Sequence, residues 1–374
     1  MKFSILQENL NKGLNITNRF IVSKAQLPIL SNILIKTDQG RIKLSATNLE
    51  IGINLWLGAK IQKEGEICVP ARILTEYITS LPPQKIDLEN KKNLLEVNSD
   101  SYNANFVSLP SVEFPAIPTL KKKPEISLNL KDLAKSISQV TFASTQDEGR
   151  PALTGVLIKT TKDGLVLVAT DGYRLSLKEI KGIKGLDKLS KQKEILIPAR
   201  ALTEVGKIIG EDKENNDLGM SISKESNQVI FSTSNVEVIS RLIEGKFPDF
   251  ERIIPDKNIT KVTVDTESFF QAVKSASIFA RESSNIIQFE INNSQMEIIS
   301  NSPQVGENRI KLEVKTEGKG GNIAFNSRYL LDLLNNIKSE LLTFEMSSSL
   351  SPGVFKPADD KSYLHVIMPI RVQE

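Results

Sequence analysis

An internal repeat is the feature that most restricts how this chain can fold. Residues 67–78 read ICVPARILTEYI and residues 195–206 read ILIPARALTEVG, which gives seven identities in twelve positions. Further upstream, residues 27–47 align without a gap with residues 150–170. Two separated matches in the same order indicate that one set of structural elements occurs twice.

A third, fainter copy lies near the C-terminus. Residues 322–334 read NIAFNSRYLLDLL, which again places a strand and a polar break before a Leu-rich helix. Arg328 of this segment lies 128 residues after Arg200, which itself lies 128 residues after Arg72. Since a chain of 374 residues is too long for one ordinary core, we predict three similar domains, over residues 1–119, 125–255 and 260–374.

Each copy shows the pattern of an α+β domain. It opens with an amphipathic helix, as in residues 130–143, where apolar residues recur at helical spacing. Alternating strands follow, such as residues 165–170 and 173–180, which the hairpin dipeptide Asp171-Gly172 joins. A second helix begins after the PAR or NSR break. The six predicted helices are residues 6–20, 71–82, 130–143, 199–210, 267–281 and 327–339.

Positive charge is concentrated on these helices. They hold eleven basic and six acidic residues, a net charge of +5, whereas the whole chain has a net charge of only +3. For any one helix the alternative is an ordinary solvated face, but all three copies share the bias. Lys and Arg without other base-reading groups fit a phosphate backbone bound independently of sequence. The basic residues are Lys12, Arg19, Arg72, Lys131, Lys135, Arg200, Lys207, Lys274, Arg281, Arg328 and Lys338.

Domain size limits how such a chain could surround a duplex. A domain of about 120 residues, treated as a sphere, is about 35 Å across. Three such spheres in a closed ring leave a gap of about 5 Å, whereas six leave a hole of about 35 Å. One chain is therefore too small to encircle DNA, and a symmetric head-to-tail dimer is the simplest ring that can.

The motifs of several other protein classes are missing. The sequence has no phosphate-binding Walker motif, no dinucleotide or metalloprotease motif, and only one His and one Cys, so we expect no catalysis, no metal and no cofactor. The N-terminus lacks the apolar run of a signal peptide, and no stretch approaches a membrane span, so we expect a cytoplasmic protein with no membrane partner. The alternatives to a ring around DNA are an enzyme acting through carboxylates and a peptide-binding repeat scaffold that does not encircle DNA.

The whole chain resembles the bacterial DNA sliding clamps, the β subunits of DNA polymerase III. The motifs that carry the resemblance are LPILSNILI, VPAR, ATDGYRL, GKFPDFERIIP and VIMPIR, in this order. The resemblance implies a head-to-tail homodimer that closes a ring of six domains, with helices lining the hole. Such a ring slides on double-stranded DNA and confers processivity without chemistry. The implied partners are a second copy of the chain, replicative and repair DNA polymerases, the clamp loader and other proteins with clamp-binding peptides.

The resemblance also implies a peptide-docking groove between the second and third domains. An apolar groove with a flexible Met suits the docking of many different peptides. Here Tyr173 replaces a His that is common in relatives, and residues 372–374 extend past the usual end. The implied docking residues are Leu153, Thr170, Gly172, Tyr173, Arg174, Leu175, Pro248, Ile253, Val366, Met368, Pro369, Ile370 and Arg371.

Two further surfaces follow from the same resemblance. The DNA-facing set comprises the helix cations named above except Lys338, together with Lys24, which stands where relatives often have Arg and so lacks the bidentate fork. The dimer seam would pack Phe106 of the first domain against Ile278 and Phe279 of the third. The alternative for these three apolar residues is a place in the interior of their own domains.

Overall fold

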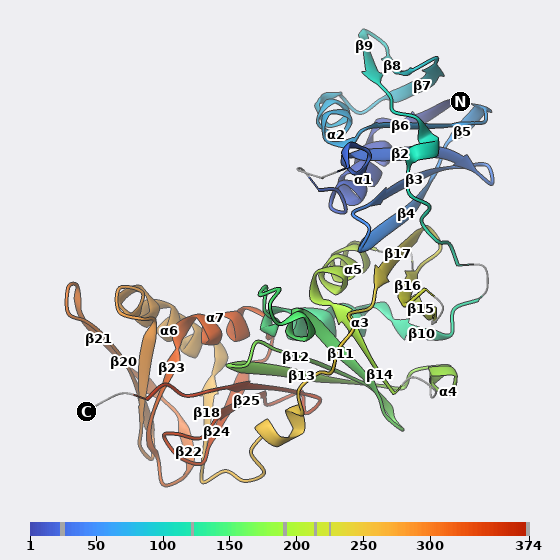
Figure 1. Ribbon diagram of the computed structural model, residues 1–374. Helices are drawn as coiled ribbons and strands as arrows, with labels where there is room; N and C mark the ends of the chain where they lie inside the picture. Colours follow the sequence, from blue (N-terminus) through green and yellow to red (C-terminus); the bar gives the residue numbers. More distant parts are fainter. Residues whose placement is uncertain (23–26, 121–122, 190–192, 213–214, 224–225, 372–374) are drawn as a thin grey trace. The chain divides into compact units, whose positions relative to one another are not determined.

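The chain folds into two compact units (Figure 1). The computed structural model describes residues 1–22, 27–120, 123–189, 193–212, 215–223 and 226–371. The first unit comprises Met1–Lys131, Lys184–Leu189 and Glu204–Leu242, and the second comprises Asp132–Ile183, Ser190–Thr203 and Ile243–Glu374. The division between the units therefore passes through the second predicted domain.

The second helix of each domain begins at the same point of the repeat. The helices α2 (Ala71–Ser80), α5 (Ala199–Glu211) and α7 (Ser327–Asn335) start 128 residues apart. Each follows directly on a strand, β6 (Glu66–Pro70), β14 (Glu194–Pro198) or β23 (Gly321–Asn326). This regularity confirms the third copy of the repeat.

The way the second helix is started differs between the copies. Pro70 and Pro198 precede α2 and α5, and the fixed φ of proline suits the entry to a helix. In the third copy Asn326 takes this place, and its side chain accepts a hydrogen bond from the amide of Arg328 at 3.0 Å. Asn caps one of the amides that a helix start leaves unpaired, which is why the NSR break can replace PAR.

The first helix of each domain also follows a strand. These helices are α1 (Gln7–Asn18), α3 (Leu130–Val140) and α6 (Thr266–Ala280). They follow β1 (Lys2–Leu6), β10 (Ile126–Asn129) and β18 (Thr260–Asp265). Within the described residues no helix is both long enough and apolar enough to span a membrane.

Some predicted helix limits need correction. The helix predicted over 130–143 ends at Val140, and its last three residues form the 3₁₀ turn η3 (Thr141–Ala143). The helix predicted over 327–339 ends at Asn335, where the Asn336 amide bonds to the Leu333 carbonyl in a tightened last turn. Asn competes with the helix for backbone hydrogen bonds, which explains the early end. The short helix α4 (Leu186–Leu189) was not predicted.

Two antiparallel sheets make up most of the first unit. The five-stranded sheet has the order β5-β1-β7-β8-β9, where β5 is Lys60–Lys63, β7 is Lys85–Lys91, β8 is Leu94–Ser99 and β9 is Tyr102–Val107. The eight-stranded sheet has the order β10-β15-β16-β17-β4-β3-β2-β6. Its remaining strands are β15 (Asp217–Ser223), β16 (Gln228–Ser232), β17 (Val236–Arg241), β4 (Ile51–Gly58), β3 (Arg41–Thr47) and β2 (Asn32–Asp38).

The second unit has the same plan. Its nine-stranded sheet has the order β14-β11-β12-β13-β26-β25-β24-β18-β22, and its four-stranded sheet the order β21-β20-β19-β23. The strands of the larger sheet are β11 (Gly155–Thr160), β12 (Gly164–Thr170), β13 (Arg174–Lys181), β26 (Tyr363–Ile367), β25 (Gly353–Pro357), β24 (Leu341–Met346) and β22 (Lys315–Gly318). Those of the smaller sheet are β21 (Gly306–Glu313), β20 (Gln295–Ser302) and β19 (Ile286–Ile291).

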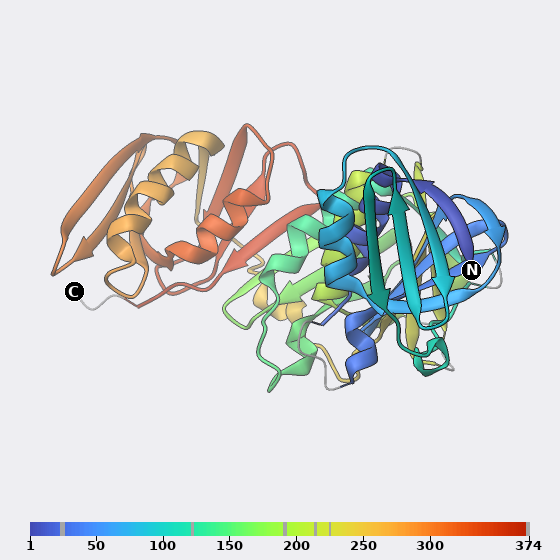
Figure 2. The ribbon, with the colours of Figure 1, turned by 90° about the horizontal axis from the view of Figure 1, so that it is seen from above.

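Helices and sheets of the third domain enclose an aromatic core. Figures 1 and 2 show α6 and α7 side by side, and residues of both helices belong to one buried cluster. Phe289 lies edge-on to Phe325 at 5.6 Å and to Phe344 at 6.0 Å between ring centroids. Edge-to-face contacts of this kind favour aromatic packing beyond the area buried. The amphipathic spacing of the helices is thus explained by burial against sheets.

Candidate functional site

The hairpin between β12 and β13 is held by side-chain hydrogen bonds. Thr170 pairs with Leu175, so four residues connect the last paired positions rather than the tight two-residue turn that Asp-Gly suggests. The Asp171 carboxylate accepts hydrogen bonds from the amides of Tyr173 at 2.8 Å and Arg174 at 3.0 Å. Gly172 has a φ of +95°, a region that glycine enters without strain. The turn is therefore well determined and presents Tyr173, which is 60% exposed.

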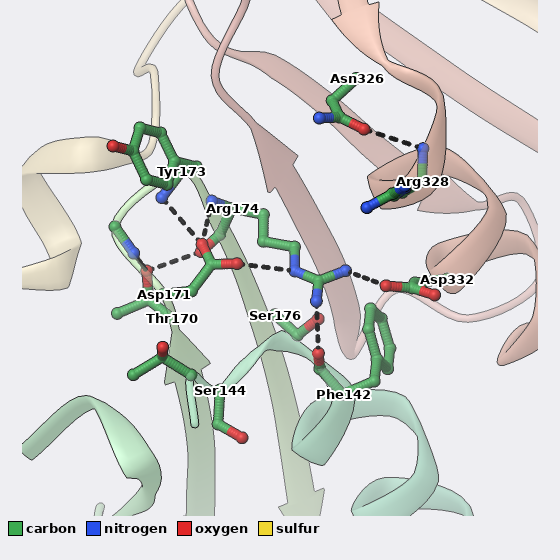
Figure 3. A network of polar contacts seen from close by, with 12 residues as sticks. Phe142, Ser144, Thr170, Asp171, Tyr173, Arg174, Ser176, Asn326, Arg328 and Asp332 are labelled. Carbon is green, nitrogen blue, oxygen red and sulfur yellow. Dashed lines mark hydrogen bonds and ion pairs between the residues drawn. The ribbon is translucent and has the colours of Figure 1, made fainter. Parts of the chain in front are cut away.

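Arg174 is the centre of a polar network (Figure 3). Its guanidinium donates to the carboxylates of Asp171 at 3.1 Å and Asp332 at 2.5 Å, and to the carbonyl of Phe142 at 2.7 Å. The guanidinium carbon also lies 4.7 Å from the ring centre of Tyr329, a cation–π contact. Arg174 is only 9% exposed, so these contacts balance the cost of burying its charge.

The C-terminal segment is hydrogen-bonded onto this hairpin. β26 pairs with β13, with Val366 opposite Leu175. Beyond β26, the amide of Met368 donates to the carbonyl of Tyr173 and that of Ile370 to the carbonyl of Ala324, both at 2.8 Å. Residues 368–370 are thus fixed at two points, one on each of the domains that the predicted groove would join.

The predicted docking residues all lie in the second unit and differ in exposure. Leu175 and Val366 are buried in one cluster with Phe247 and Phe250, and Ile253 packs against it. We call the five exposed residues the docking face; they are Gly172, Tyr173, Pro248, Met368 and Arg371. Buried are Leu153, Thr170, Arg174, Leu175 and Val366; half-buried are Ile253, Pro369 and Ile370; and exposed are Gly172, Tyr173, Pro248, Met368 and Arg371.

Most of the predicted DNA-facing cations are exposed. Lys24 lies outside the described residues, and Arg19 is half-buried. The other nine, Lys12, Arg72, Lys131, Lys135, Arg200, Lys207, Lys274, Arg281 and Arg328, are exposed.

Several of these cations already have a carboxylate partner. Four ion pairs join Arg19 to Glu211, Arg72 to Glu76, Lys135 to Asp360 and Lys207 to Glu204, all at 2.8 to 2.9 Å. The Arg72–Glu76 pair is well exposed on both sides, and such a pair is worth about 0–1 kcal/mol, so a phosphate can displace Glu76 from Arg72. The carboxylates of Asp360 and Glu204 are largely buried.

Asp360 is held by two lysines at once. Its carboxylate accepts from Lys135 at 2.8 Å, from Lys178 at 2.7 Å and from the hydroxyl of Ser362 at 2.5 Å. Burial alone would raise the pKa of Asp360, but these hydrogen bonds lower that pKa far below its usual range. Since Lys178 alone would keep Asp360 paired, Lys135 can leave it without stranding the buried charge.

The residues predicted for the dimer seam differ in exposure. Phe106 on β9 is 8% exposed, and its ring meets that of Tyr77 edge-on at 5.5 Å. Ile278 on α6 is 58% exposed, and Phe279 is half-buried. β9 and β21 are edge strands of their sheets, so both offer unpaired backbone groups.

The site contains functional residues that were not predicted from the sequence. Asp332 and Tyr329 of α7 hold Arg174, and Arg150 donates to the carbonyl of Asp171 at 3.0 Å. A signal for Asp332 was present, because Glu76, Glu204 and Asp332 each stand four residues after the repeated arginine. The part of the chain that the structure describes contains no cluster of three His, Cys, Asp or Glu side chains that could hold a metal ion.

The fold and the site together define a class of protein. The chain contains three copies of one α+β domain, and each copy has a cation at the same exposed helix position. A hydrogen-bonded C-terminal segment completes the features of a clamp-type protein. Comparison with known proteins gives the family. The models of the N-terminal, central and C-terminal domains of the DNA polymerase III beta subunit match residues 1–118, 127–249 and 251–371.

Individual relatives match along the full length. The beta sliding clamp of Staphylococcus epidermidis is 32% identical, over 99% of each chain. The DNA polymerase sliding clamp of Bacillus subtilis is 27% identical, with a TM-score of 0.90 and complete coverage of both chains. A Pseudomonas aeruginosa sliding clamp bound to griselimycin, also 27% identical and fully covered, has a TM-score of 0.90. The chain therefore belongs to the family of DNA polymerase III beta subunits, the beta sliding clamps, which are non-catalytic processivity factors.

Proposed function

We propose that two copies of this chain close head to tail into a ring around double-stranded DNA in the cytoplasm. The ring would have six domains, with limits near residues 1–119, 125–255 and 260–374 in each chain, and would tether the replicative polymerase. The docking face would bind short peptides of replicative and repair polymerases, of the clamp loader and of other partners. Family membership supports the ring, and the fixed C-terminal segment supports the docking face.

The strongest support for the DNA-facing surface comes from the three repeated arginines. Arg72, Arg200 and Arg328 occupy the same position of α2, α5 and α7, and all three are exposed. A cation near a helix N-terminus is mildly unfavourable, because the helix dipole is positive there. A partner that carries negative charge accounts for an arginine at this place in every copy.

A matched pair of triple variants tests this proposal. Arg72→Glu, Arg200→Glu and Arg328→Glu together reverse one helix cation in each domain. Lys60→Glu, Lys162→Glu and Lys315→Glu reverse one exposed cation in each domain at strand and loop positions instead. Fluorescence anisotropy with a short linear duplex, over a series of salt concentrations, would compare the two.

The two variants carry the same change of charge, so they separate position from net charge. We expect the helix variant to bind DNA far more weakly, with a salt dependence that is shallower by about 0.9 for each phosphate that the protein no longer neutralises. We expect the control variant to stay close to the wild type. Equal weakening in both would show that charge acts without a defined surface, and unchanged binding in both would favour a peptide-binding scaffold that does not encircle DNA.

A further inference from the structure

A carboxylate follows the repeated arginine in each of the three copies. Glu76 follows Arg72, Glu204 follows Arg200 and Asp332 follows Arg328, in each case by four residues. Residues four apart lie on one face of a helix and can form an ion pair. The three copies therefore have the same potential pair, near the start of α2, α5 and α7.

The three carboxylates are used differently. Glu76 pairs with Arg72 at 2.8 Å, as the spacing favours. Glu204 pairs instead with Lys207, three residues further on, at 2.8 Å. Asp332 pairs with Arg174 at 2.5 Å.

The third case connects two surfaces. Figure 3 shows Arg328 and Asp332 on the same helix, with Asp332 reaching toward Arg174 of the docking hairpin. Arg328 is exposed and has no ion pair among the described residues. The cation expected to face DNA thus remains unneutralised while Asp332 is held by Arg174.

Asp332 has the freedom to change partners. Its side chain is 46% exposed, whereas that of Arg174 is 9% exposed. Arg174 has a second carboxylate, Asp171, and the carbonyl of Phe142, so its charge stays balanced if Asp332 turns away. The first copy shows that an arginine can pair with the carboxylate four residues after it.

We propose that Asp332 is a shared counter-ion that couples the docking face to the DNA-facing surface. While Arg174 holds Asp332, Arg328 is free to contact a phosphate. When a docked peptide draws Arg174 away, Asp332 pairs with Arg328 and weakens that contact. The inference rests on the proposed function, and by linkage DNA would in turn weaken the docking of such a peptide.

A double-mutant cycle in DNA binding tests the coupling. Arg174→Gln removes the competitor for Asp332, so we expect weaker binding to a short linear duplex, by about twofold for each Arg328 and about fourfold for a two-chain ring. This weakening should disappear at high salt. The double variant Arg174→Gln with Asp332→Asn should bind like the wild type, because no carboxylate remains to neutralise Arg328. A double variant as weak as Arg174→Gln alone would overturn the coupling.

Arg328→Gln separates failure of the coupling from failure of the proposed function. If Arg328→Gln weakens DNA binding and Arg174→Gln does not, the coupling is wrong and the DNA-facing surface stands. If Arg328→Gln has no effect, Arg328 does not contact DNA and both proposals fail at this position.

A variant in the first copy guards against misfolding of Arg174→Gln. Glu76 and Arg72 are both well exposed, so Glu76→Gln leaves the core untouched. If a carboxylate four residues away weakens the phosphate contact of an arginine, Glu76→Gln should strengthen DNA binding by about twofold for each chain. Unchanged binding would remove the mechanism by which Asp332 could act.

Discussion

Tyr173 and Arg174 are neighbours in the chain with opposite roles. The resemblance to sliding clamps implied a docking role for both, but Tyr173 is 60% exposed and Arg174 is 9% exposed. Tyr173 belongs to the turn, whereas Arg174 begins β13, where Arg174 and Leu175 are both buried. The buried guanidinium of Arg174 pairs with Asp332, which lies 158 residues further along the chain. The repeat marks Asp332 as one of three equivalent carboxylates but does not indicate that Asp332 pairs with Arg174, which is why the hairpin was predictable and the burial of Arg174 was not.

His365, the single histidine, is a buried neutral residue. It is 0% exposed, and its Nδ1 lies 2.6 Å from the hydroxyl of Ser176. Burial lowers the pKa of His365 to about 3, and the charge of Arg174 acts in the same direction. The imidazole therefore stays neutral at physiological pH and contributes to packing.

This histidine should make the chain less stable in mild acid. The unfolded chain binds a proton at His365 below about pH 6.5, whereas the folded chain resists protonation down to its pKa of about 3. Stability from this source is full above about pH 6.5 and is lost as the pH falls. Between about pH 7 and about pH 5 we expect a loss of about 2 kcal/mol in the free energy of unfolding. Urea unfolding at both pH values measures it.

His365→Gln should remove this pH dependence while leaving a polar group beside Ser176. Ser176→Ala is the matched control, because it removes the same hydrogen bond and keeps the titrating group. The control should be less stable at both pH values, with the wild-type dependence between them. A His365→Gln variant that loses as much stability as the wild type would show that another group titrates.

At the scale of the element, helix starts were more predictable than helix ends. The starts of α2, α5 and α7 were predictable from the residue directly before each helix, which is a proline or an asparagine. The end of α7 depends on a weaker balance, because Asn335 and Asn336 disfavour the helix while Ile337 is still buried. α4 has too few residues to show a periodic pattern, so no sequence signal predicted it.

The extension of β26 should be the element on which peptide docking depends. Met368 is 38% exposed, next to Tyr173, and its amide is fixed to the Tyr173 carbonyl. A short peptide of a replicative polymerase, of the kind proposed above to bind the docking face, serves as the probe. Met368→Ala removes apolar contact and keeps the backbone bond, so we expect calorimetry to show affinity reduced about tenfold, since truncation of a central contact costs on the order of 1–2 kcal/mol.

Leu350→Ala is the matched control for this measurement. Leu350 is a large exposed apolar residue of the same unit, 57% exposed, and it lies outside the docking face. We expect the affinity of this variant for the peptide to match that of the wild type. Equal weakening in both variants would place the binding surface elsewhere.

At the scale of the whole molecule, the sheets do not respect the predicted domain limits. β17 of the second domain pairs with β4 of the first, and β13 of the second pairs with β26 of the third. The sequence predicted three similar domains correctly, because the repeat is local and can be aligned. Pairing between edge strands of different domains depends on long-range register, which the repeat does not encode. The second domain on its own would expose two strand edges, β13 and β17, so we do not expect it to behave as an independent fragment.

The proposed ring requires two chains to associate, and a substitution at Ile278 tests this association most directly. Ile278 is 58% exposed on α6, whereas Phe106 packs against Tyr77 within its own domain, so a charge at Phe106 would also disturb folding. Ile278→Asp would bury an unpaired carboxylate in the proposed seam, which is unfavourable enough to prevent association. We expect light scattering to give the mass of one chain for this variant and of two chains for the wild type. Leu350→Asp places the same charge at an equally exposed position of the same unit and should remain a dimer. If both variants are dimers the seam lies elsewhere, and if both are monomers the charge acts through stability rather than through the interface.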